Sequence, residues 1–274
     1  PRGDKLLLEG ENTDILKLCV VLDSLIYFLK QNENLNESNL NQIIEGKGDK
    51  LLKPESGRVI LFGTNKKKIK AHTLNQIKII EAFENNDMVF AIGPAGTGKT
   101  YTGVALAVKA LKDKDVKRII LTRPAVEAGE NLGFLPGDLK DKLDPYMQPL
   151  YDALKEMIQI EKLDDYIKRG IIEIAPLAYM RGRTLDNAFV ILDEAQNTTE
   201  NQMKMFLTRM GKKAKFMITG DPGQIDLPKS SMSGLKQANV LLQKIDGIDI
   251  VYLDGSDVIR HKLVRSIIDA YNTK

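Results

Sequence analysis

The sequence is poor in the residues that build disulfides and zinc centres. Among 274 residues it has one cysteine, Cys19, and two histidines, His72 and His261, which stand far apart. A single cysteine excludes an intramolecular disulfide, and its apolar neighbours Leu18 and Val20 indicate a buried structural thiol. The histidines lack the spacing of zinc ligands, so we expect no zinc site.

The sequence also lacks a long hydrophobic run and a strong charge of either sign. The most apolar early stretch, residues 15–29, contains Lys17 and Asp23 and is too short to span a bilayer, so we interpret it as a core helix. No stretch resembles a signal peptide, and we expect a cytoplasmic protein with no membrane partner. The net charge of +3 is nearly balanced and does not by itself indicate a nucleic-acid-binding protein.

A glycine-rich pattern, GPAGTGKT at residues 93–100, is the strongest feature present. It follows an apolar run of strand length at 88–92 and matches G-x-x-x-x-G-K-[ST] at each fixed position. Glycine lets backbone N–H groups approach phosphate oxygens, and a helix beginning near Lys99 adds the positive end of its dipole. We expect Lys99 to reach the β- and γ-phosphates and Thr100 to ligate Mg²⁺. The residues expected to bind ATP here are Gly93, Pro94, Ala95, Gly96, Thr97, Gly98, Lys99, Thr100 and Tyr101.

Two adjacent carboxylates, Asp193 and Glu194, follow a second apolar run at 188–192. Successive side chains of a strand point to opposite faces, so the two neighbouring carboxylates can have different roles. We expect Asp193 to bind Mg²⁺ and Glu194 to act as general base on the attacking water. Downstream of a phosphate loop, this interpretation is favoured over a pair that merely caps a helix.

Two glutamines are candidates for the same site. Gln224 follows a third apolar run at 215–219 and is expected to sense the γ-phosphate and the attacking water, with Asp221 in support. A simple Asp-Pro-Gly turn is the alternative for this segment. Gln76 lies on a short helix before the phosphate loop, and its amide offers the donor and acceptor that an adenine edge requires. The alternative is an ordinary surface glutamine.

Arginines are candidates for the cation that phosphoryl transfer needs on its developing charge. Arg209 and Arg260 are the leading candidates, whereas Arg123, Arg181 and Arg183 suit RNA phosphates or loop ordering. Each has the alternative of a structural ion pair. The long segment 124–149, rich in glycine and proline, is expected to be a loop, and its Phe134 either stacks on RNA or pins the loop to the domain.

The order of apolar runs and helical patterns predicts an α/β fold. From residue 73 onward strands and helices alternate, as in a parallel sheet with crossover helices. Residues 1–46 read as a small α+β segment with a strand at 5–8, and residues 47–72 as a linker with a strand at 59–62. The basic run at 66–70 is either solvated or a contact for polynucleotide phosphate. Strands are predicted at 88–92, 117–122, 171–175, 188–192, 215–219 and 249–253, and helices at 14–30, 38–46, 75–84, 99–112, 200–210, 233–245 and 258–271.

From about residue 59 to its C-terminus, the chain resembles the PhoH-like family of P-loop ATPases. The resemblance lies in GPAGTGKT at 93–100, LTRPAVEAGENLGFLPGDL at 121–139, DPYMQPLYDAL at 144–154, APLAYMRGRTLDNAFVILDEAQN at 175–197, QMKMFLTRMG at 202–211, TGD and QIDLP within 219–228, and DVIRHKLV at 257–264. It implies a RecA-like core, similar to that of superfamily 1 helicases, and an ATP-binding domain linked to RNA metabolism. It also implies an endoribonuclease partner in ribosomal RNA maturation. Residues 1–46 resemble the later part of a KH-like module, without its GXXG loop.

The sequence therefore predicts a Mg²⁺-dependent ATPase, over residues 73–274, coupled to single-stranded or ribosomal RNA as a helicase or maturation factor. The alternative is a nucleotide-gated adaptor with little turnover that regulates a ribonuclease or a ribosome-associated partner. A GTPase is disfavoured because no Asn-Lys-x-Asp follows the phosphate loop, and a small-molecule kinase because no acceptor pocket is indicated. Residues 73–274 have room for only one RecA-like sheet, so a complete site needs an arginine from another molecule. We therefore expect a ring-like homo-oligomer in which a neighbouring chain supplies this arginine.

Overall fold

The computed structural model describes residues 37–44, 57–124, 139–228 and 231–259, single positions at 10, 18, 21, 22, 25, 26 and 29, and only the backbone of 139–145. It divides into two compact units, Pro1–Arg58 with His72–Leu74, and Val59–Ala71 with Asn75–Lys274. In the first unit the helix α2 (Glu37–Ile44) lies where a helix was predicted from Ser38. The strand predicted at 5–8 and the helix predicted at 258–271 lie outside the described residues.

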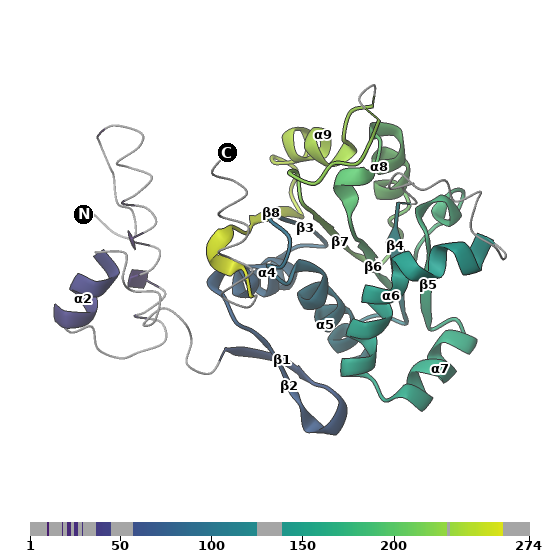
Figure 1. Cartoon of the computed structure of the whole chain (residues 1–274), viewed down its shortest axis with the longest axis horizontal. Coiled ribbons are helices and arrows are strands. Elements are labelled where there is room, and N and C mark those ends of the chain that lie inside the picture. The colour runs from purple at the N-terminus through teal and green to yellow at the C-terminus, as the bar shows by residue number, and fades with distance from the viewer. Residues whose placement is uncertain are drawn as a thin grey trace. The chain divides into compact units, whose positions relative to one another are not determined.

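The second unit is built on a six-stranded parallel sheet with strand order β5-β4-β6-β7-β3-β8 (Figure 1). Each strand predicted from residue 73 onward is present, with shifts of one residue at some ends, so the α/β prediction is confirmed. The strands are β3 (Met88–Ile92), β4 (Arg118–Arg123), β5 (Ile172–Pro176), β6 (Ala188–Leu192), β7 (Lys215–Gly220) and β8 (Ile248–Tyr252).

The inner strands are continuous apolar runs because helices cover both faces of the sheet. All residues of β3 and β6 are buried, whereas the edge strand β8 has exposed and half-buried positions. Parallel strands that are buried on both faces lose the alternation of polar and apolar residues seen in half-exposed sheets. This is why the sequence predicted these strands from apolar runs alone.

Helices α4 (Leu74–Asn85) and α5 (Lys99–Lys112) cover one face of the sheet. Phe83 of α4 packs on Phe189 of β6, with ring centroids 5.1 Å apart. A Cβ added to Gly103 of α5 would lie 2.5 Å from Sδ of Met217, so glycine permits the close approach of α5 to β7. α6 (Leu139–Met157) packs beside α5 and against β5, followed by α7 (Ile160–Lys168).

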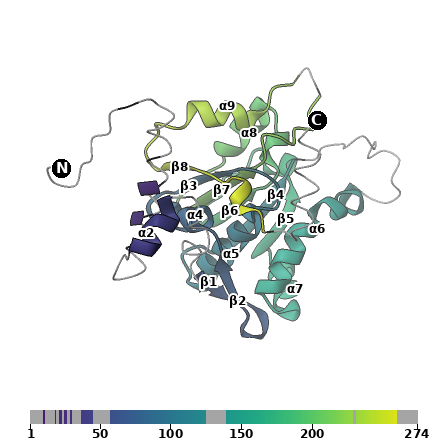
Figure 2. The ribbon, with the colours of Figure 1, turned by 60° about the vertical axis from the view of Figure 1, so that its left-hand side comes forward.

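Helices α8 (Glu200–Leu207) and α9 (Gly234–Leu241) cover the opposite face (Figure 2). They contribute Met203, Phe206 and Leu235 to a core cluster with side chains of β3, β6 and β7. Phe206 packs on Phe216 of β7, with ring centroids 5.0 Å apart. None of the helices in the described part of the chain is long and apolar enough to cross a membrane.

The loop expected at 124–149 is corrected over residues 139–149, because α6 already begins at Leu139, whereas residues 125–138 lie outside the described residues. Pro145 and Pro149 suggested irregular structure, since proline removes a helical hydrogen bond. The helix nevertheless continues through both positions, because its apolar side chains recur at helical spacing and are buried. These side chains are Met147, Leu150, Ala153, Leu154 and Met157.

The range expected to be a linker also contains regular structure. β1 (Arg58–Phe62), where a strand was expected, pairs with β2 (Lys68–Ala71) in a two-stranded sheet, and a short turn, η1 (Thr64–Lys66), connects them. The turn is fixed to α6, because Oγ1 of Thr64 donates to the Glu156 carbonyl at 3.0 Å and the Lys67 ammonium pairs with the Glu156 carboxylate at 2.5 Å. Residues 59–71 accordingly group with the second unit.

Candidate nucleotide-binding site

The polar motifs of the sequence meet at the carboxyl edge of the sheet. The glycine-rich loop follows β3, Asp221 follows β7, Asp193 follows β6, and Arg123 ends β4. These four strands are neighbours in the order β4-β6-β7-β3, so the segments that follow them lie side by side. Ligands of open α/β sheets bind at this edge.

The glycine-rich loop forms a turn that only a permissive backbone allows. Gly96 and Gly98 adopt left-handed φ values of +80° and +77°, and α5 begins at Lys99. The Lys99 ammonium donates to the carbonyl oxygens of Gly93 at 2.6 Å and Pro94 at 2.7 Å. The ammonium therefore lies within the loop that would surround a phosphate chain.

Gln76 reaches the same loop from α4. It is 2% exposed, and Nε2 donates to the Thr97 carbonyl at 2.8 Å. A Cβ on Gly98 would lie 2.7 Å from Nε2 of Gln76. The alternative of a surface glutamine is therefore wrong, because this amide packs against the phosphate loop. Its contact with adenine stays a prediction.

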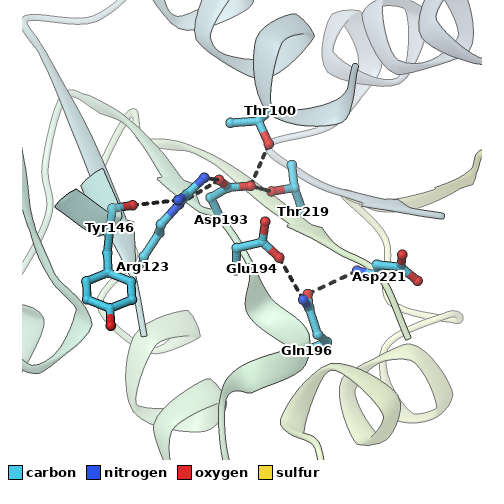
Figure 3. A network of polar contacts seen from close by, with 8 residues as sticks. All are labelled: Thr100, Arg123, Tyr146, Asp193, Glu194, Gln196, Thr219 and Asp221. Carbon is cyan, nitrogen blue, oxygen red and sulfur yellow. Dashed lines mark hydrogen bonds and ion pairs between the residues drawn. The ribbon is translucent and has the colours of Figure 1, made fainter. Parts of the chain in front are cut away.

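Asp193 is a buried carboxylate held by donors from three neighbouring segments (Figure 3). Its Oδ1 accepts from the hydroxyls of Thr100 at 2.6 Å and Thr219 at 2.5 Å. Its Oδ2 accepts from Nε of Arg123 at 2.9 Å and Nη2 at 2.5 Å. The two residues predicted to hold Mg²⁺, Thr100 and Asp193, thus lie in contact, whereas no motif singles out Thr219.

Arg123 lies at the carboxyl edge of the sheet, beside Asp193. Its guanidinium is 13% exposed, pairs with Asp193, and donates through Nη1 to the Tyr146 carbonyl of α6 at 2.6 Å. This contact agrees with the alternative of a structural ion pair, and a contact of Arg123 with RNA stays a prediction. Arg123 ties Asp193 to α6.

Glu194 and Gln196 form a second polar link, also visible in Figure 3. Glu194 has left-handed backbone angles, φ 55° and ψ 37°, and its Oε2 accepts from Nε2 of Gln196 at 2.7 Å. Oε1 of Gln196 accepts from the Asp221 backbone N–H at 3.0 Å. The amide is 1% exposed and so connects the acidic motif to the segment after β7. Sequence reasoning assigned no role to Gln196, although it stands two positions after Glu194.

The segment after β7 lies against the phosphate loop. The Ala95 backbone N–H donates to Oδ2 of Asp221 at 3.0 Å, which brings Asp221 to the position expected for a supporting residue. The Gln224 carbonyl accepts from Gln196 at 3.3 Å, and Gln224 is exposed. Its role as a sensor stays a prediction.

Of the predicted arginines that the structure describes, Arg123 lies at this edge and Arg209 does not. The backbone carbonyl of Arg209 accepts from the N–H of Leu185, just before β6, so Arg209 lies at the amino edge of the sheet. A contact with a γ-phosphate of its own chain is therefore wrong. Arg183 pairs with Glu173 at 2.6 Å as a structural ion pair, and Arg181 is exposed. Two predicted residues, Arg260 and Phe134, lie outside the described residues.

Tyr101 points away from the loop. Its hydroxyl donates to Oε2 of Glu156 at 3.1 Å, and burial together with the Glu156 carboxylate raises the pKa of Tyr101 to about 12. The prediction that Tyr101 contacts ATP is corrected for its side chain, which contacts α6 instead. Hydrogen bonds from Lys67 and Tyr101 hold the pKa of Glu156 below its usual range.

The oxygen ligands available at Asp193 suit a magnesium ion. A hydroxyl, Thr100, and a carboxylate, Asp193, are the hard oxygen ligands that Mg²⁺ prefers, and Mg²⁺ at phosphate sites commonly uses one or two protein ligands. Within the described ranges, no three His, Cys, Asp or Glu side chains cluster as for a metal held by protein alone. The arrangement suits a metal shared with phosphate oxygens.

Comparison with known proteins places these motifs in a family. The sequence pattern of the family described as PhoH-like protein matches residues 68–272. The chain is 51% identical over 274 residues to a PhoH-like protein of Bacillus subtilis (strain 168), covering 99% of this chain and 86% of that protein. It is 45% identical over 199 residues to Protein PhoH of Escherichia coli (strain K12), covering 72% and 56%. The crystal structure of Pif1 helicase from Candida albicans is similar at 15% identity and TM-score 0.42, covering 75% and 44%, and we base no inference on it.

Proposed function

The chain belongs to the PhoH-like protein family, and from this premise we propose that it is a Mg²⁺-dependent ATPase whose cycle is coupled to RNA. Its core is that of a P-loop NTPase. The observation that carries the proposal is the contact between the Thr100 hydroxyl and the Asp193 carboxylate at 2.6 Å, with Glu194 next in the chain. A phosphate loop that meets an acidic strand end in this way provides both parts of a hydrolytic site.

In the proposed mechanism the phosphate loop binds the phosphates and excludes water from them. Lys99 moves from the Gly93 and Pro94 carbonyls to the β- and γ-phosphates, an exchange of neutral acceptors for charged ones that strengthens its hydrogen bonds. Thr100 and Asp193 would hold Mg²⁺, whose chemistry here is to neutralise charge on the phosphate oxygens. Gln76 braces the loop and is proposed to read the adenine edge.

Glu194 is proposed to accept the proton of the attacking water. Its backbone is left-handed, and the Gln196 amide holds Oε2 in one orientation. Gln196 also binds the backbone of Asp221, which in turn binds Ala95 in the phosphate loop. Gln196 is therefore a positioning residue that links the general base, Glu194, to the phosphate loop. Gln224 is proposed as the sensor of the γ-phosphate beside it.

The first experiment is the steady-state ATPase rate with and without single-stranded RNA, for wild type, Lys99→Ala and Glu194→Gln. We expect RNA to raise the wild-type rate, Lys99→Ala to lose ATP affinity, and Glu194→Gln to bind ATP normally with at least about 100-fold slower turnover. Tight ATP binding with negligible wild-type turnover under every condition would contradict an ATPase. It would favour a nucleotide-gated adaptor, whose partner, such as an endoribonuclease, would then be sought.

A complete site is proposed to need a second copy of the chain. Arg209 lies at the amino edge and can reach a γ-phosphate only in a neighbouring molecule. We therefore expect a homo-oligomer, checked by analytical ultracentrifugation with and without ATP. A chain that stays monomeric while hydrolysing ATP at its full rate would overturn this part of the proposal.

A further inference from the structure

A second concave site lies at the far end of α5 from the phosphate loop. It is a cavity of about 430 Å³ between the η1 turn, the C-terminal half of α5, and the junction of α6 and α7. α5 rises 1.5 Å per residue, so Lys112 at the cavity lies about 20 Å along the helix from Lys99. The cavity is therefore separate from the site described above.

The walls of the cavity carry positive charge without a matching negative charge. Three lysines line it, Lys66, Lys112 and Lys162, and no aspartate or glutamate is among the described lining residues. The Lys112 ammonium donates to the backbone carbonyls of Phe62 at 2.9 Å and Met157 at 3.4 Å. In the described part of the chain none of the three lysines has a carboxylate within ion-pair distance. The walls thus favour an anion.

Glu156, which precedes the lining residue Met157, is already engaged elsewhere. Glu156 pairs with Lys67 at 2.5 Å and accepts from the Tyr101 hydroxyl at 3.1 Å. The charges of Lys112 and Lys162 repel each other, and burial and this repulsion lower the pKa of Lys112. A bound anion would relieve the repulsion, because an opposite charge stabilises the ammonium form.

One wall is aromatic. Tyr166 of α7 lines the cavity, half-buried, and the Lys162 ammonium lies 5.4 Å from its ring centroid. An aromatic ring beside cations is the combination that binds a nucleotide, with the base stacked on the ring and the phosphate on the ammonium groups. The cavity volume falls within the range of small-molecule sites, which begins at about 300 Å³.

We propose that this cavity binds one phosphorylated nucleotide, with its phosphate on Lys66, Lys112 and Lys162 and its base against Tyr166. The nucleotide is either free in solution or a unit of an RNA strand, since both present the same phosphate and base. The strand form rests on the proposed coupling to RNA, whereas the free form does not. In the strand form, the exposed Lys68 of β2 lies two residues after Lys66 in the same basic run.

The absence of tryptophan from the chain permits a local test. The substitution Tyr166→Trp makes the cavity wall the only tryptophan of the full chain, and its fluorescence is titrated with AMP and, separately, with a 5′-phosphorylated single-stranded RNA decamer. We expect a saturable change with at least one probe. Lys66→Gln combined with Lys162→Gln should weaken it at least about tenfold, as loss of two charge-assisted contacts implies.

Two controls separate the cavity from the phosphate loop and from general charge. Lys168→Gln removes an exposed lysine of the same helix that does not line the cavity, and Lys99→Ala disables the phosphate loop. Both should leave the tryptophan signal unchanged within about twofold. A response to AMP identifies a free nucleotide, and a response to RNA alone identifies a strand.

The proposal is overturned if neither probe gives a saturable signal, if the double lysine variant responds like wild type, or if Lys99→Ala abolishes the response. Anisotropy of labelled RNA with the chain that keeps Tyr166 provides a second measurement should Tyr166→Trp fold poorly. The basal ATPase rate of the double lysine variant, measured in parallel, should equal that of wild type. Absence of ATPase activity in the wild-type chain would contradict the proposed function. It would not contradict the proposal that the cavity binds a nucleotide.

Discussion

The side-chain amide of Gln196 lies 2.7 Å from the carboxylate of Glu194, with Nε2 as the donor and Oε2 as the acceptor. We expect Gln196→Ala to lower kcat for ATP by about 100-fold, because a general base that is free to rotate loses most of its advantage. The ATP dissociation constant should change little, since the amide contacts Gln224, the proposed sensor, only at its backbone carbonyl. Steady-state kinetics and equilibrium binding of ATP measure the two effects.

Ser233→Ala is the matched control for this change. The Ser233 hydroxyl donates to the backbone carbonyl of Gln196 at 2.8 Å, so its removal loosens the same segment without touching the amide. Both variants should lose about 1 kcal/mol or more of unfolding free energy, the cost of a lost buried hydrogen bond. Equal kcat values for the two variants would show that Gln196 acts only through stability.

The ion pair between Arg123 and Asp193 should stabilise the fold, because both groups are nearly buried. We expect Arg123→Gln to lower the free energy of unfolding by about 3 kcal/mol, since it leaves a buried carboxylate with hydroxyl donors alone. Urea unfolding of Arg123→Gln, Asp193→Asn and the double variant completes a double-mutant cycle. Additive losses, within about 0.5 kcal/mol, would mean that the two side chains do not interact.

Gly98→Ala should impair nucleotide binding more than its backbone conformation alone explains. Gly98 has φ +77° and a Cβ there would lie 2.7 Å from Nε2 of Gln76. Gly182 has a nearly equal φ of +76°, with no described atom within 4 Å of the same Cβ. Both substitutions should cost about 1–2 kcal/mol of unfolding free energy. Only Gly98→Ala should lower ATP affinity, by about tenfold or more, in isothermal titration calorimetry.

The ion pair between Glu173 and Arg183 should make stability depend on acid pH. A hydrogen bond from Arg183 lowers the pKa of Glu173 below its ordinary value. A carboxylate with a lowered pKa in the folded state contributes stability above its unfolded pKa and loses it as pH falls through its folded pKa. The difference in unfolding free energy between wild type and Glu173→Gln should therefore be constant from pH 7 to about 5 and shrink below about 4.5. A difference that grows on acidification would contradict the assignment.

The strands and α5 were predictable because each of them is determined by local sequence. Runs such as 88–92 and 188–192 are apolar throughout, which parallel strands covered on both faces require. The glycines of the phosphate loop and Lys99 fix the start of α5 within the same few residues. The start of α6 within 124–149 was harder to predict, since Pro145 and Pro149 suggest a loop. Only the tertiary packing of the helix outweighs this preference.

The partners of the site residues depend on strand order, which periodicity does not give. Thr219 and Arg123 meet Asp193 only because β7 and β4 both lie beside β6. The position of Arg209 follows from the return of the chain to the amino edge after α8, and no motif in the sequence reports it. The role of Gln196 could not be predicted for a related reason. Its acceptor, Glu194, follows β6, whereas its donor, the Asp221 N–H, follows β7.

The left-handed backbone of Glu194 implies a conflict between activity and stability at one residue. A non-glycine residue in this region costs about 1–2 kcal/mol, and asparagine tolerates it better than glutamate does. Glu194→Asn should therefore melt at a higher temperature than wild type while losing turnover. A strained glutamate at this position accords with its proposed role as general base.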